Sequence, residues 1–227
     1  MNLFLDTNVI IGFIFSLNSL HKLSKKIFSK THHTYFYSNT VKDEVDLVFD
    51  RKKEEYKTFL RTINHHLEKL KNTRIISIFE MHKIIDKINK IGKFSNEDMH
   101  STFNKMWKYF DFAENQEIST IIVFIEKLIE ELKSLHDNRK NYLLESIKEI
   151  PNHSSKNQKV LRMIEKENLR EHLDEKDEKI LFDLNEYASK YPQLDLCLVS
   201  WDDGFIKAVK ILLDRLSFKK YIGRDEI

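Results

Sequence analysis

The chain has 227 residues with 38 basic and 36 acidic side chains, so its formal net charge is only +2. This balance excludes a global charge signal for nucleic-acid binding and leaves only local signals to consider. The single cysteine, Cys197, excludes an internal disulfide framework. Only four glycines and two prolines occur, which favours long helices. The length fits one domain, or one domain that carries a large insertion.

The N-terminal residues do not resemble a secretory signal peptide, because they lack a basic leader and because Asp6 ends the first apolar stretch early. No apolar run reaches the ~18 residues that a membrane-spanning helix needs. We therefore expect a soluble, cytoplasmic protein that has no membrane partner.

The first fifty residues predict two pairs of a strand and a helical segment. Asn2–Leu5 is a short apolar strand, and a buried apolar helix over 9–15 follows it, with a Lys-rich helix after that. Thr34–Ser38 is rich in aromatic residues, which predicts a second strand. A long helix then begins, carries Glu44 in its first turn and continues to about residue 70.

The middle of the chain, from about residue 51 to 170, is predicted to be almost wholly helical, because apolar residues recur there at helical spacing. Pro151 and the polar residues 152–157 predict a break. The C-terminal part alternates again, with a helix over 175–188, a strand over 194–200, a helix over 205–213 and a strand over 218–222.

This pattern predicts an α/β fold in which both ends of the chain contribute strands to one parallel sheet flanked by helices. Residues 1–50 and 170–227 would form the core. Residues 51–169 would form a mostly helical insertion that serves as a cap, or as an arm that binds a partner or a nucleic acid.

Four carboxylates lie where binding sites of parallel sheets are usually built. Asp6 and Asp202 each follow a strand, and Glu44 and Asp177 lie near the starts of helices. Carboxylates that share a partly desolvated pocket repel one another unless a cation neutralises them. Oxygen ligands without histidine or cysteine suit Mg²⁺ or Mn²⁺, and such an ion activates water for attack on a phosphoryl group.

The sequence around these acids resembles the motifs of PIN-domain nucleases. Residues 3–9, 40–45, 177–181 and 198–205 resemble the first to the fourth motif in that order, with Ser200 in the usual hydroxyl position before the last acid. The resemblance covers roughly residues 1–50 and 170–227, whereas the middle segment has no counterpart in small PIN domains. It implies a PIN-like fold and hydrolysis of RNA, or less often DNA, by a metal-activated water.

The resemblance also implies a role for each acid. Asp6, Asp177 and Asp202 would ligate one or two metal ions, and Glu44 would complete the site or help to activate the nucleophile. Residues that could orient these acids or a metal-bound water are Thr7, Asn8, Ser200 and Asp203.

The third motif leaves two candidate ligands open. Asp174 and Asp177 both precede or begin the same predicted helix, and Asp177 is better placed against the apolar residues that follow it. Asp183 lies further along that helix, where we expect a surface residue.

Residues 51–75 carry eight basic and three acidic side chains, a local excess of five positive charges. Candidates for holding a phosphate backbone, in a salt-dependent manner, are Arg51, Lys52, Lys53 and Arg61. The alternative is a solvated face of a Lys-rich helix. The histidine pairs at 32–33 and 65–66 lack zinc-site spacing and cysteine partners, so we expect them at the surface.

Two further functions remain open at this point. The chain could be an inactive PIN-like module that binds RNA, a protein partner or a second copy through its helical insertion. It could also be a phosphatase with an aspartyl nucleophile, although Asn8 stands where that family normally has a second aspartate. Within the nuclease hypothesis, a toxin and an RNA-processing enzyme are both possible, but toxins of the family are generally smaller.

Overall fold

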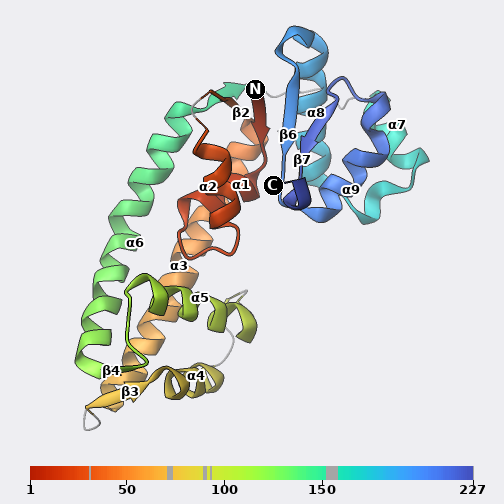
Figure 1. Ribbon diagram of the computed structural model, residues 1–227. Helices are drawn as coiled ribbons and strands as arrows, with labels where there is room; N and C mark the ends of the chain where they lie inside the picture. Colours follow the sequence, from red (N-terminus) through yellow and green to blue (C-terminus); the bar gives the residue numbers. More distant parts are fainter. Residues whose placement is uncertain (31, 71–73, 89–90, 93, 152–157, 227) are drawn as a thin grey trace. The chain divides into compact units, whose positions relative to one another are not determined.

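The computed structural model describes residues 1–30, 32–70, 74–88, 91–92, 94–151 and 158–226, and Figure 1 traces the chain. The chain divides into two compact units. The first comprises Met1–Ser16, Leu20–Leu47 and Asn141–Ile227, and the second comprises Leu17–Ser19 and Val48–Lys140. Residues 141–151 and 158–169, predicted as part of the insertion, thus belong to the first unit.

The first unit contains a parallel sheet flanked by helices, which confirms the predicted α/β class. Its strands are β1 (Asn2–Leu5), β2 (Thr34–Ser38), β5 (Lys148–Ile150), β6 (Leu196–Val199) and β7 (Lys220–Ile222). They lie in the order β5-β2-β1-β6-β7, and each neighbouring pair is parallel.

Strand β6 is apolar throughout and β1 is apolar from Leu3 onward, because both faces of the sheet are covered. Leu3, Phe4 and Leu5 of β1 are fully buried, as are Leu198 and Val199 of β6. In the register of the sheet, Leu5 stands beside Val199. The backbone of the next residue continues the pairing, because the Asp6 N–H donates to the Val199 carbonyl at 3.0 Å.

Helices of the first unit follow the predicted pattern with small differences at their ends. They are α1 (Thr7–Ile14), α2 (His21–Phe28), the start of α3 (Asn39–Lys69), the end of α6 (Ile118–Ser146), α7 (Gln158–Lys166), α8 (Glu175–Lys190) and α9 (Asp203–Leu212). Glu44 was predicted to lie in the first turn of this helix. Because α3 begins at Asn39, Glu44 lies in its second turn instead.

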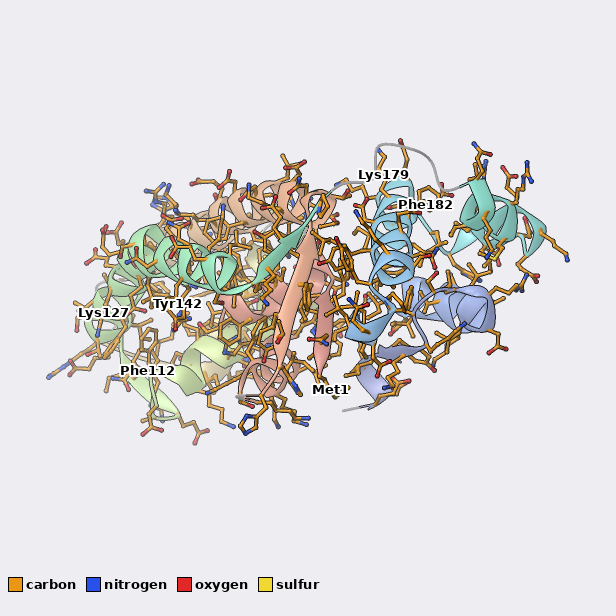
Figure 2. All side chains as sticks on the ribbon, turned by 90° about the horizontal axis from the view of Figure 1, so that it is seen from above. Met1, Phe112, Lys127, Tyr142, Lys179 and Phe182 are labelled. Atoms are coloured by element: carbon orange, nitrogen blue, oxygen red, sulfur yellow. The ribbon has the colours of Figure 1, made fainter. Side chains whose placement is uncertain are left out.

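Helix α8 packs on β2 with one face and meets solvent with another. Tyr187 contacts Phe36 of β2, with ring centroids 6.2 Å apart. Figure 2 labels two further side chains of this helix, Lys179 and Phe182. Phe182 is buried, whereas Lys179 is exposed and pairs with Glu175 at 3.2 Å. The helix therefore has the apolar stripe that a sheet-flanking helix needs.

The prediction that residues 51–170 are almost wholly helical is wrong at three short strands. β5 pairs with β2 and extends the main sheet, while β3 (Ile75–Ser77) and β4 (Asn115–Glu117) form a separate antiparallel pair. Each has only three residues, too few to show a periodicity of two, and each is defined by its partner strand. Residues 152–157, predicted as a break, lie outside the described residues.

The second unit is mainly helical and has its own core. Besides parts of α3 and α6, it contains α4 (Ile78–Lys87) and α5 (Asn96–Tyr109). Helix α5 starts at Asn96, where Ser95 and Asp98 form a capping box. Phe59 and Phe103 are fully buried. Within the described ranges of the chain, no helix has the length and apolar character needed to cross a membrane.

Candidate functional site

The topology of the sheet defines one edge where a site is expected. From β1 the chain passes to β2 and later to β5 on one side, whereas β6 and β7 lie on the other side of β1. Ligands of open parallel sheets bind outside the carboxyl ends of the strands at such a reversal of strand order. Asp6 directly follows β1, and Ser200 and Asp202 follow β6, so these residues lie at that edge.

Asp6 is buried and accepts hydrogen bonds on both carboxylate oxygens. Its Oδ1 accepts from the backbone N–H of Thr7 at 2.6 Å, as the N-cap of α1. Its Oδ2 accepts from Asn8 Nδ2 at 2.7 Å and from Ser200 Oγ at 2.6 Å. The carboxylate is therefore held in one orientation by donors from both central loops.

Asn8 and Ser200 also join the loops that follow β1 and β6. Asn8 Oδ1 accepts from the backbone N–H of Trp201 at 2.8 Å, and Ser200 Oγ accepts from that of Asp202 at 3.0 Å. Asp202 Oδ1 in turn caps α9 by accepting from the Phe205 N–H at 2.8 Å. The exposed Asp202 side chain is thus positioned relative to the buried Asp6 by a continuous set of hydrogen bonds.

Glu44 is held near Asp6 by Thr7, the residue that follows Asp6 in the sequence. Thr7 Oγ1 donates to Glu44 Oε2 at 2.7 Å. The other oxygen, Oε1, accepts from Lys176 Nζ at 3.3 Å, so Glu44 and Lys176 form an ion pair. The first turn of α8 therefore contributes both an acid, Asp177, and an ammonium group that offsets part of the negative charge.

Asp174 and Asp177 have separate roles at the start of α8. Asp174 is the exposed N-cap and accepts from the backbone N–H groups of Lys176 and Asp177 at 2.8 and 2.9 Å. Asp177 completes the capping box, because its Oδ2 accepts from the Asp174 N–H at 3.1 Å. Both acids thus stabilise the helix start, and Asp177 is the more buried of the two.

Burial and the charges of neighbouring acids raise the pKa values of two acids at this edge, Asp6 and Asp177. Burial is the main cause that raises the pKa of Asp6 from 3.8 to about 7; hydrogen bonds from Ser200 and Thr7 oppose it, and the charges of Glu44 and Asp202 add to it.

Burial likewise raises the pKa of Asp177 to about 7, with smaller contributions from the charges of Asp174, Asp6 and Asp202. The structure thus brings Asp6, Glu44, Asp177 and Asp202 within electrostatic reach of one another.

The acids are not, however, arranged as a finished ligand set. Among the residues that the structure describes, no three His, Cys, Asp or Glu side chains stand close enough together to hold a metal ion. Asp203 is exposed and pairs with Arg224 at 3.6 Å. A cation bound by Asp6, Asp177 and Asp202 would therefore require these side chains to move toward one another.

One acid lies elsewhere than predicted. Asp183, expected at the surface, is buried and accepts from Thr40 Oγ1 at 2.9 Å. The bond joins α8 to the first turn of α3, one turn before Glu44. The residues around Asp183 in the sequence gave no sign of its burial, because the contact with Thr40 depends on how α8 and α3 pack.

The predicted phosphate-binding residues lie in the second unit, and three of them have acidic partners. Arg51 and Lys52 lie 3.9 and 3.7 Å from the buried Glu55, and Lys53 pairs with Asp137. Arg61 is exposed. These pairs reduce the positive charge that α3 offers to a phosphate backbone.

The raised pKa of Asp6 predicts an unusual pH dependence of stability. Between about pH 4 and pH 7 the folded chain keeps a proton on Asp6 that the unfolded chain releases, so the free energy of unfolding falls as pH rises. At ~1.4 kcal/mol per pKa unit, the whole effect is on the order of 4 kcal/mol.

The measurement is urea unfolding of wild type and Asp6→Asn at several pH values, with a chelator present. The unfolding free energy of wild type is subtracted from that of each variant at every pH. This subtraction is needed because burial lowers the pKa of His136 to about 4, so the contribution of His136 to stability rises with pH while that of Asp6 falls. We expect the difference in unfolding free energy to grow with pH for Asp6→Asn and to stay constant for the exposed control Asp43→Asn. Parallel curves for all three proteins would contradict the burial argument.

Comparison of the chain with family models, with curated proteins and with solved structures finds no match, so the assignment of a function rests on the geometry of this site.

Proposed function

We propose that this protein is a metal-dependent endonuclease of the PIN type that hydrolyses phosphodiester bonds, most readily in RNA, in the cytoplasm. One observation carries the proposal. Four carboxyl groups come from distant parts of the chain to the carboxyl ends of the two strands where the sheet order reverses. There the charges of Glu44 and Asp202 raise the pKa of Asp6, and the charges of Asp6 and Asp202 raise the pKa of Asp177.

The electrostatics support a divalent cation at this edge. Burial, with a smaller contribution from the charges of neighbouring carboxylates, raises the pKa of Asp6 and of Asp177 to about 7, and a cation would stabilise the ionised form of both side chains. The Lys176 ammonium group pairs with Glu44. An all-oxygen donor set suits Mg²⁺ or Mn²⁺, so Asp6, Asp177 and Asp202 would hold the ion with Glu44 beside them. When bound, the ion supplies a water of lowered pKa and stabilises charge on a phosphoryl oxygen.

The surrounding residues orient the acids. Ser200 and Asn8 fix Asp6, and Thr7 fixes Glu44, so three neutral side chains set the direction of two carboxylates. Hydrogen bonds from such neighbouring side chains fix the orientation of a metal ligand, and their removal lowers metal affinity or activity. Lys176 is exposed and next to Asp177, so its ammonium group would be able to exchange its pairing with Glu44 for a pairing with an incoming phosphate.

The phosphatase alternative loses support from the contacts of Asn8. An aspartyl phosphatase needs a second carboxyl two residues after its nucleophile to transfer a proton. Here Asn8 has no acidic proton, and both ends of its amide are used to join Asp6 to Trp201.

The test is a substrate panel with purified full-length protein. We expect cleavage of single-stranded RNA, with slower or no cleavage of single-stranded DNA, in Mg²⁺ or Mn²⁺ and none in excess chelator. A small phosphomonoester should remain intact. No metal-dependent cleavage of any polynucleotide, in the presence of measurable RNA binding, would favour the inactive binding module instead.

A further inference from the structure

A short sequence pattern occurs twice in the second unit. Residues 77–82 read Ser-Ile-Phe-Glu-Met-His, and residues 95–100 read Ser-Asn-Glu-Asp-Met-His. In both copies the serine and the acid three residues later form a capping box, at the starts of α4 and α5 respectively. The pattern therefore fixes where each helix begins and at which turn its histidine stands.

The two copies bring their histidines together. Helices α4 and α5 pack against each other (Figure 1). Met81 and Met99 are fully buried. His82 and His100 stack with ring centroids 4.8 Å apart, and their Nδ1 atoms lie 2.6 Å apart. His82 also meets the buried ring of Phe103 edge-on at 5.4 Å, which limits its rotation.

A third residue sets the tautomer of His100. Asp86 Oδ1 lies 2.8 Å from His100 Nε2. A carboxylate can only accept, so Nε2 carries the hydrogen and the Nδ1 of a neutral His100 presents a lone pair to His82. Only one proton, or one cation, can be accommodated between two ring nitrogens that face each other at this distance.

We propose that His82 and His100 form a binding site for a transition-metal ion of the Zn²⁺, Ni²⁺ or Cu²⁺ type, with Asp86 orienting His100 from behind. Imidazole nitrogen is a preferred ligand of these ions, and a carboxylate on the opposite ring nitrogen is its usual support. His82 then carries its proton on Nε2 and offers Nδ1 to the metal. The site is separate from the acidic edge and does not depend on the nuclease proposal.

The geometry requires a small adjustment. At a Zn–N distance of about 2.0–2.1 Å, two tetrahedral ligands are about 3.3 Å apart, so the rings must separate slightly from 2.6 Å. The described part of the chain offers no third protein ligand, and water would complete the coordination. Such an ion would link α4 to α5 and stabilise the second unit.

The experiment titrates Zn²⁺ into the full-length protein at pH 7.5 by calorimetry and follows the histidine ring nitrogens by NMR. We expect one ion per chain, with shifts at the Nδ1 atoms of His82 and His100. His82→Gln and His100→Gln should lose this binding, and Asp86→Asn should weaken it roughly 10–100-fold. The matched control His65→Gln, exposed and beside His66 at a ring distance of 6.3 Å, should bind as wild type does.

His82→Asn keeps the proposal testable if the glutamine variants fold poorly. Its amide can replace the hydrogen bond to His100 Nδ1 without supplying an imidazole, so it should fold but not bind Zn²⁺. Adding Mg²⁺ should leave both ring signals unchanged. Zn²⁺ binding that survives in His82→Asn and His100→Gln, or wild-type protein without Nδ1 shifts, would overturn the proposal and leave an ordinary hydrogen-bonded pair.

Discussion

Asp6→Asn is expected to lower metal-dependent RNA cleavage by ~1000-fold or more, equivalent to about 4 kcal/mol of transition-state stabilisation. The substitution preserves the size of the side chain but removes one negative charge from the centre of the acidic edge. It also replaces one accepting oxygen by an amide NH2 group, which would face either the Thr7 N–H at the position of Oδ1 or the donors of Asn8 and Ser200 at the position of Oδ2. Both effects weaken the capture of a divalent ion, because Mg²⁺ and Mn²⁺ bind a correctly oriented carboxylate more tightly than a neutral amide.

The matched control is Asp43→Asn, which removes the same charge from an exposed residue next to Glu44 on α3. It should retain nearly all of the activity. Initial cleavage rates of the three proteins, purified in parallel, provide the measurement, and thermal unfolding confirms that each is folded. Equal rates for wild type and Asp6→Asn would mean that a contaminating nuclease is responsible and would remove the support for the enzyme.

Trp201→Ala is expected to reduce the free energy of unfolding by about 3–5 kcal/mol. Trp201 is fully buried and directly follows Ser200, so it anchors the loop that carries two site residues. Its indole N–H donates to the buried Ser24 Oγ at 2.9 Å, and its carbonyl accepts from Arg224 Nε at 2.6 Å. Truncation leaves a cavity and a buried hydroxyl without its donor.

A second variant separates the two contributions. Trp201→Phe retains most of the apolar volume and loses mainly the hydrogen bond to Ser24, so it should cost less than the alanine variant, about 1–3 kcal/mol. Urea unfolding of the two variants and wild type gives the comparison. An alanine variant as stable as wild type would show that this loop is not fixed by Trp201.

Local sequence determined the elements of the sheet that both ends of the chain supply. The apolar runs of β1 and β6 are long enough to be recognised, because strands buried on both faces need continuous hydrophobic residues. Asp6, Asp174 and Asp202 stand directly before helices, where a carboxylate caps free backbone N–H groups, so their positions were also visible in the sequence.

Tertiary structure alone decided the features that depend on partners distant in sequence. β5 is a strand because β2 offers it an open edge, and Asp183 is buried because Thr40 of another helix meets it. The pairing of Lys176 with Glu44 and the facing nitrogens of His82 and His100 have the same origin. Hydrophobic periodicity and capping residues predict local elements, because they depend on residues that are close in the sequence. The contacts named here form only when segments distant in the sequence pack together and exclude water.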